Sequence, residues 1–186
     1  MSNHCQQIKR NLVFLVNTTW DSKHWPALYW RELTVKAIHA GYTVHFTSGS
    51  FSEWQRIQKI TQGLSRVICY PRQSILAVKA LLEQALAVVT VDTGFGHLAA
   101  ALNIPVIALF GATDPHKSRP YSPKTQVIQV DLAAYPCSPC LNQHCTHPNR
   151  HQALTPPCYQ SCTPQRVWEA LTASISSSLP MESAQS

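Results

Sequence analysis

The sequence predicts an α/β fold in which a parallel sheet is doubly wound, with helices on both of its faces. Two observations support this. Short apolar runs rich in β-branched residues alternate with longer helical segments, and glycine-containing or polar turns separate them. The chain has 186 residues, which is enough for one domain with a full core.

The first half of the chain contains three predicted strands, each followed by a predicted helix. The strands are expected at 12–16, 43–47 and 66–70, and the helices at 26–39, 52–61 and 74–85. Gly41 and Gly63 suit the left-handed positions that end the first two helices. Ser74 suits the N-cap of the third helix. Four residues at helical spacing are expected to form the buried stripe of that helix: Ile75, Val78, Leu81 and Leu82.

The second half begins with regular elements and then changes in composition. Strands are expected at 87–91, 105–110 and 126–130, with a small-residue helix at 98–102 and a closing helix at 165–174. Ten of the 13 prolines and five of the seven cysteines lie beyond Asp114, so residues 115–162 are expected to be largely loop. The predicted domain therefore covers 11–175, with a Cys/Pro-rich loop at 131–162, a polar lead at 1–10 and a loose tail at 176–186.

The charge balance favours anionic partners. The 15 Lys and Arg against nine Asp and Glu give a net charge of +6, but the basic residues are scattered, so nucleic acid is not an expected partner. No run reaches the roughly 18 apolar residues of a membrane-spanning helix. The N-terminus lacks the features of a signal peptide, so a cytoplasmic location is expected.

The segment DTGFGH, residues 92–97, lies at the carboxyl end of a predicted strand, where a helix begins. Such a turn presents unpaired N–H groups and the positive end of a helix dipole, which favours a diphosphate. Gly94 and Gly96 are expected to let the backbone approach a ligand. The alternative is an ordinary strand-to-helix turn with an Asp cap. Short connections are expected to bring the loops after the first, second and fifth strands to this same edge of the sheet.

The longer segment DTGFGHLAAALNIPVIALFGATDP resembles the donor-site signature of glycosyltransferase family 9, the bacterial heptosyltransferases of the lipopolysaccharide inner core. The resemblance implies a Rossmann-like domain equivalent to the C-terminal domain of a GT-B glycosyltransferase. It also implies ADP-heptose as donor, an inner-core lipopolysaccharide acceptor at the cytoplasmic face of the membrane, and transfer with inversion. The subtype stays open.

The resemblance also implies the residues that bind the donor. Thr18, Thr19 and Lys23 are expected to contact its phosphates, and Asp92, Thr93 and Gly94 to complete the cradle. His97 either contacts the donor or braces the loop. Glu53 accepts from the ribose hydroxyls or serves as a first-turn helix acid, and both interpretations remain open. Gln73 is a weaker candidate at the base pocket. No cofactor is required, since Lys23, backbone N–H groups and the helix dipole neutralise the diphosphate.

The cysteines form the pattern Cys137-x2-Cys140-x4-Cys145-x12-Cys158-x3-Cys162. Taken alone, this spacing suits a structural zinc or an iron–sulfur site. Because similar inserts occur in the family, a structural role as a thiol-rich loop or an adventitious metal site is favoured over a catalytic metal. Cys5 and Cys69 are expected to be unconnected with it.

The family's acceptor-binding half, which carries the general base, has no counterpart in this sequence. Asp21 is the one acid near the phosphate loop, and a turn role suits it better. Three interpretations follow: a heptosyltransferase whose N-terminal half is encoded separately or upstream, a non-catalytic nucleotide-sugar-binding module, and a zinc or iron–sulfur protein. The third is disfavoured by the sheet motifs.

Overall fold

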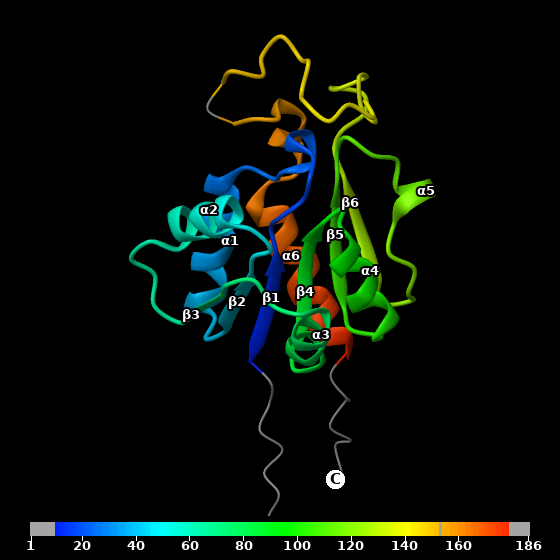
Figure 1. Ribbon diagram of the computed structural model, residues 1–186. Coiled ribbons are helices and arrows are strands. Elements are labelled where there is room, and N and C mark those ends of the chain that lie inside the picture. Colours follow the sequence, from blue (N-terminus) through cyan, green and yellow to red (C-terminus); the bar gives the residue numbers. More distant parts are fainter. Residues whose placement is uncertain (1–9, 153, 179–186) are drawn as a thin grey trace, which may run out of the picture.

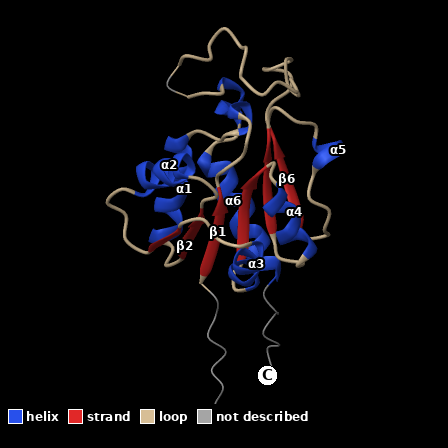
Figure 2. Ribbon diagram, viewed as in Figure 1, coloured by secondary structure: helices blue, strands red, loops and turns tan. Residues whose placement is uncertain are grey.

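The computed structural model describes residues 10–152 and 154–178, and these form a six-stranded parallel sheet with the strand order β3-β2-β1-β4-β5-β6 (Figures 1 and 2). This order, in which the chain runs outward from β1 in one direction and then returns to extend the sheet from β4 in the other, is that of a doubly wound fold. The predicted fold class is therefore confirmed. The strands are β1 (Asn11–Leu15), β2 (Thr43–Thr47), β3 (Val67–Tyr70), β4 (Ala87–Val91), β5 (Val106–Phe110) and β6 (Thr125–Gln129).

The helices connect these strands and cover both faces of the sheet (Figure 1). The α-helices are α1 (Ala27–His39), α2 (Phe51–Thr61), α3 (Ile75–Glu83), α4 (Gly94–Ala101), α5 (Pro115–Ser118) and α6 (Pro164–Ser178), and the 3₁₀ helices are η1 (Asp21–Lys23) and η2 (Pro157–Ser161).

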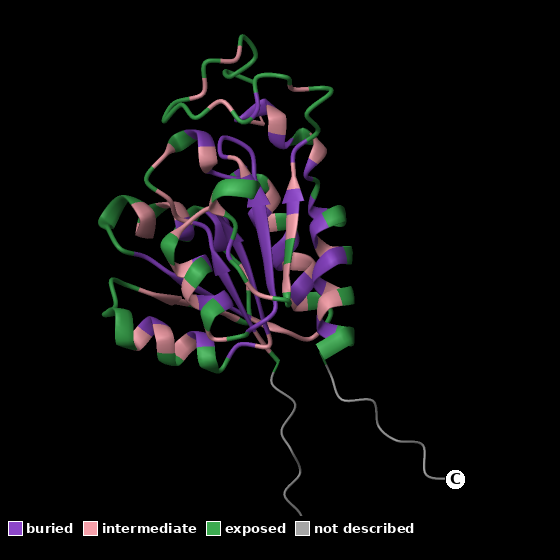
Figure 3. Cartoon of the chain, turned by 90° about the vertical axis from the view of Figure 1, so that its right-hand side faces the viewer, coloured by how far each residue is buried: buried purple, intermediate pink, exposed green. Residues whose placement is uncertain are grey.

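The alternation of side chains along β1 divides the core between the two faces. Leu12 and Phe14 pack with the buried residues of α1, α2 and α6. Val13 and Leu15 pack with those of α3 and α4. Every residue of β4 and β5 is buried, as expected for central strands covered on both sides (Figure 3).

Local signals in the sequence set several helix boundaries. The Ser50 and Ser74 hydroxyls accept hydrogen bonds from the backbone N–H groups of Glu53 and Ala77, which caps α2 and α3. Gly41 and Gly63 have φ values of +86° and +74°, so both occupy the left-handed conformation that was predicted after α1 and α2.

Three details of the second half differ from the predictions. α4 begins at Gly94, four residues before the predicted start, because Thr93 is its N-cap and both glycines fall in its first turn. α6 continues to Ser178, so Ser176 to Ser178 are helical, whereas the rest of the predicted tail lies outside the described residues. The proline-rich segment, predicted to be largely loop, does contain α5 and η2.

The predicted buried stripe of α3 was partly wrong. Val78 and Leu82 are buried, and Leu81 is half-buried, but the side chain of Ile75 is 69% exposed. Ile75 is the first residue of α3, at the edge of the sheet, where the helix has not yet reached the core. Among the described residues, no helix is long and apolar enough to cross a membrane.

Candidate functional site

A cavity with about 1000 Å³ of empty space, open mouth included, lies at the carboxyl ends of β1, β2 and β4. All eight residues predicted to bind the donor line it: Thr18, Thr19, Lys23, Glu53, Asp92, Thr93, Gly94 and His97. They come from three segments that are far apart in the sequence, namely the loop after β1, the start of α2, and the turn from β4 into α4, and the parallel sheet brings these to one edge. The loop after β5, which was also predicted to join this edge, contributes through Thr113.

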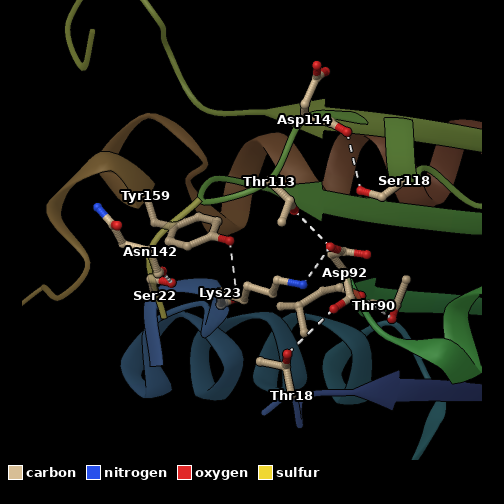
Figure 4. A network of polar contacts seen from close by, with 11 residues as sticks. Thr18, Ser22, Lys23, Thr90, Asp92, Thr113, Asp114, Ser118, Asn142 and Tyr159 are labelled. Atoms are coloured by element: carbon tan, nitrogen blue, oxygen red, sulfur yellow. Dashed lines mark hydrogen bonds and ion pairs between the residues drawn. The ribbon is translucent and has the colours of Figure 1, made fainter. Parts of the chain in front are cut away.

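Lys23 is held in place by a charged partner. Its Nζ lies 2.8 Å from Asp92 Oδ2, and the two side chains are 15% and 10% exposed. The ammonium also lies 4.4 Å from the centre of the Trp20 ring, within the range of a cation–π contact. Figure 4 shows Lys23 and Thr113 both pointing toward Asp92. A fixed ammonium at the rim of a cavity suits an anionic group.

Asp92 is the centre of this network. In addition to Lys23, Oδ2 accepts a 2.8 Å hydrogen bond from the Thr113 hydroxyl. The Thr18 hydroxyl approaches the Asp92 carbonyl oxygen at 3.5 Å. Because a carboxylate repels phosphate, the contacts of Asp92 fit a residue that positions Lys23 better than one that touches the anion itself.

The first turn of α4 forms one wall of the cavity. The Thr93 side chain makes no capping hydrogen bond, so its hydroxyl stays available. A Cβ built on Gly94 would meet no atom within 4 Å, whereas one on Gly96 would lie 3.0 Å from Thr90 Cγ2. The expectation that Gly96 admits a ligand was therefore wrong: this glycine lets α4 pack closely on β4.

Glu53 both caps a helix and lines the cavity. Its Oε2 accepts a 2.5 Å hydrogen bond from Gly49 N, while its own N–H donates to Ser50 Oγ. This reciprocal arrangement is a capping box shifted by one residue. Both interpretations from the sequence remain compatible with the geometry, since the carboxylate has a second oxygen.

Two candidate residues lie elsewhere. Gln73 does not line the cavity and is exposed before α3. Asp21 pairs at the surface with His144, whose Nδ1 lies 2.9 Å from Asp21 Oδ2. Both acids that line the cavity, Asp92 and Glu53, have partners, so within the described residues the cavity has no unengaged carboxylate.

The sequence analysis did not identify several residues of the site, among them Asn17, Phe95 and Thr113. Asn17 and Phe95 line the cavity, and Thr113 orients Asp92 from the loop after β5. Asn17 Nδ2 donates to Thr47 O at 2.9 Å and so ties the loop after β1 to the end of β2. Asn17 directly precedes the two threonines at the end of the first predicted strand, which was a signal that could have identified it.

His24, next to Lys23, is buried and electrically neutral. Burial, with a smaller contribution from the nearby Arg56 guanidinium, lowers the pKa of His24 to about 4. Its Nδ1 lies 3.2 Å from Val16 O, which fits a proton on Nδ1. The residue thereby fixes the loop to the end of β1.

The cysteine-rich loop packs against the back of the Lys23 loop (Figure 1, yellow to orange, above the sheet). The Tyr159 hydroxyl donates to Lys23 O at 3.1 Å, and Trp25 Nε1 donates to Cys162 O at 2.8 Å. Both rings are buried. The segment after β6 therefore supports the backbone that presents Lys23.

A second cavity is enclosed by the cysteine-rich loop. Four of the five predicted cysteines line it, Cys137, Cys140, Cys145 and Cys158, together with His147 and Ser22. Cys162 is instead part of the main core and is fully buried. Burial, and then the charges of neighbouring cysteines, raise the pKa of Cys158 to about 12, and burial raises that of Cys162 to about 11. Cys69 lies on β3, as a residue apart from this group. Cys5 lies outside the described residues.

Comparisons with known proteins agree on one family. The model of glycosyltransferase family 9 (heptosyltransferase) matches residues 1–151. Lipopolysaccharide heptosyltransferase 1 of Pseudomonas aeruginosa is 39% identical over 176 residues, which cover 88% of this chain and 48% of that protein.

Two solved structures extend this similarity. Escherichia coli heptosyltransferase WaaC with ADP has 36% identity and a TM-score of 0.64, over 66% of this chain and 38% of that one. E. coli ADP-heptose lps heptosyltransferase II has 27% identity and a TM-score of 0.70, over 92% and 48%. The match to the P. aeruginosa protein covers most of this chain. The chain thus spans about half the length of that curated relative.

Proposed function

Because the chain belongs to glycosyltransferase family 9, the heptosyltransferases, we propose that its larger cavity binds a nucleotide-sugar donor of the ADP-heptose type. In this proposal the protein supplies the donor-binding half of heptosyl transfer to the lipopolysaccharide inner core. The observation that carries it is the meeting, in one cavity, of the Lys23 ammonium, three threonine hydroxyls and the first turn of α4.

Each part of the cavity has a role in this proposal. The ammonium, already oriented by Asp92, takes a phosphate oxygen of the diphosphate. Thr18, Thr19 and Thr93 donate hydroxyl hydrogen bonds, and the N–H groups at the start of α4 add the partial positive charge of a helix N-terminus. At the α2 end, the free oxygen of Glu53 accepts from the ribose hydroxyls. The leaving diphosphate is neutralised without a metal ion.

The acceptor and its general base belong outside this set of residues. Inversion at the anomeric carbon requires a base beside the acceptor hydroxyl. Asp92 is paired with Lys23, and Glu53 is assigned to the ribose, so we assign the base to a second half supplied by another chain or segment. The acceptor then approaches the open side of the cavity at the inner face of the membrane.

Calorimetric titration with ADP and with ADP-heptose tests the donor site. Lys23→Ala and Thr93→Ala are each expected to weaken binding by about 1–3 kcal/mol, because each removes a donor to a charged phosphate. Lys59→Ala, an exposed lysine of the last turn of α2, is the charge-matched control and should bind as the parent does. Unchanged affinity in both site variants would refute the assignment.

A non-catalytic nucleotide-sugar-binding module is the second candidate. It is favoured by the absence of an unengaged carboxylate among the described residues that line the cavity. Both candidates predict that the chain binds the donor, and only the first predicts that it takes part in heptosyl transfer.

A further inference from the structure

The cavity within the cysteine-rich loop is separate from the proposed donor site. It encloses about 370 Å³ of empty space, open mouth included, and the thiols of Cys137, Cys140, Cys145 and Cys158 all line it. These cysteines are free thiols. Four thiols around one space form a donor set that suits a soft divalent cation in tetrahedral coordination.

The positions of the cysteines support this assignment. Cys137 and Cys140 flank a turn that is anchored to the sheet edge, where Leu141 N donates to Ala112 O at 2.9 Å and the Ser138 hydroxyl donates to Gly111 O. Cys158 lies in η2. Cys145 comes from the segment between them. The four cysteines thus come from three parts of the loop, and one of these parts, the turn that holds Cys137 and Cys140, is anchored to the sheet edge.

His147 lines the same cavity. Its Nδ1 accepts a 3.1 Å hydrogen bond from Asn149 N, so the neutral ring carries its proton on Nε2. In this state Nε2–H can donate to a ligating thiolate, which makes His147 a partner of a ligand.

We propose that this cavity is a structural site for one thiolate-bound divalent cation of the Zn²⁺ or Fe²⁺ type. Each ligating thiol gives up its proton to solvent as its sulfur binds the cation. In the described residues no group of three His, Cys, Asp or Glu side chains is yet arranged to hold an ion, so binding draws the thiols inward. Between β6 and η2 the described residues form only turns and bends, which lets the thiols move.

The proposed metal site is linked through one loop to the proposed donor cavity. Ser22 lines the cavity of the cysteine-rich loop, and its N–H donates to Gln143 O at 3.1 Å. The next residue, Lys23, lines the proposed donor cavity. A bound cation would therefore order the loop that presents the lysine, and its removal would loosen this loop.

Metal content is the first test, and it does not depend on nucleotide binding. The full chain, purified without chelators from medium supplied with Zn²⁺ and Fe²⁺, is analysed by elemental mass spectrometry, which also identifies the ion. About one ion per chain is expected. Thiol titration of the folded protein should find the cavity cysteines protected, and a chelator should expose them and lower the melting temperature. Readdition of the ion should restore both the protection of the thiols and the melting temperature.

Substitution identifies the ligands. Cys145→Ser and Cys158→Ser are each expected to lower the metal content at least tenfold, while Cys69→Ser, the matched control on β3, retains it. If a variant fails to fold, Co²⁺ loaded into the chelator-treated parent chain should give the thiolate-to-cobalt absorption of a tetrahedral site. A parent chain without stoichiometric metal, cavity cysteines joined as disulfides, or full metal content in both variants would overturn the proposal.

Discussion

Lys23 illustrates how single side chains are prepared for a task in this fold. An exposed lysine populates many rotamers, so restricting its side chain to a single rotamer on binding a ligand costs conformational entropy. Here Asp92 and Trp20 already hold the side chain, and Thr113 holds Asp92. The ion pair is largely withdrawn from water, so its geometry depends on all of these residues being present.

His24 makes the Lys23 loop sensitive to acid. Its pKa is about 4 in the folded chain against an ordinary value of 6.5, so between these two values the unfolded chain takes up a proton that the folded chain does not. The free energy of unfolding should therefore fall as the pH drops from 6.5 to 4. Allowing for partial solvent screening, His24 should contribute about 2 kcal/mol to this loss.

Urea denaturation across this pH range checks the contribution. His24→Gln can still donate to Val16 O but has no proton to gain, so its stability should fall less steeply with acid than that of the parent. His45, whose pKa burial also lowers, should leave some of the slope in both proteins. Parallel stability curves for the two proteins would count against His24 as the cause.

At the level of elements, η2 connects the cysteine-rich loop to the donor cavity. A Cβ on Gly111, just after β5, would lie 2.9 Å from Tyr159 Cζ in the fully buried ring. Gly111 thus allows η2 to sit directly on the end of the sheet, from where the Tyr159 hydroxyl reaches Lys23 O.

Gly111→Ala should therefore affect both stability and binding. Overpacking against the buried ring is expected to cost about 1–3 kcal/mol in unfolding free energy, and displacement of Tyr159 should weaken ADP binding. Tyr159→Phe, which keeps the ring and loses only the hydroxyl, should cost about 1 kcal/mol. Thermal and chemical denaturation with parallel calorimetry make the comparison. A Gly111→Ala protein as stable as the parent would show that η2 is not packed this way.

At the level of the whole molecule, the doubly wound sheet has a core on each of its two covered faces, whereas the proposed donor cavity is open at the carboxyl edge of the sheet. The chain spans about half of its P. aeruginosa relative. Binding and transfer should therefore be separable in this protein.

The chain alone is expected to bind ADP-heptose and to transfer no heptose. An assay for ADP release, with a lipopolysaccharide acceptor lacking heptose, measures this, and the full-length P. aeruginosa relative serves as positive control. Addition of a family N-terminal half as a separate chain should then produce transfer. Transfer by the chain alone would place the base within it, and binding without transfer under both conditions would favour the non-catalytic module.

The sequence determined the strands and most helix boundaries, because their signals are local: β-branched runs, serine caps and glycines after helices. The eight candidate site residues came from the resemblance to the family, and the structure brings all of them to one cavity. The sequence failed at Ile75, where helical spacing does not reveal that the first turn projects beyond the core. It also misjudged Gly96, because the adjacent side chain belongs to another element.

Only the tertiary structure decided which of these residues act together. The Lys23–Asp92 pair joins positions 69 residues apart, and Thr113 reaches Asp92 only because β4 and β5 pair in parallel. Likewise, the spacing treated five cysteines as one group, and the fold assigned Cys162 to the core and the other four to a cavity. Local sequence sets backbone conformation, whereas long-range contacts depend on how the elements pack, and this packing defines both cavities.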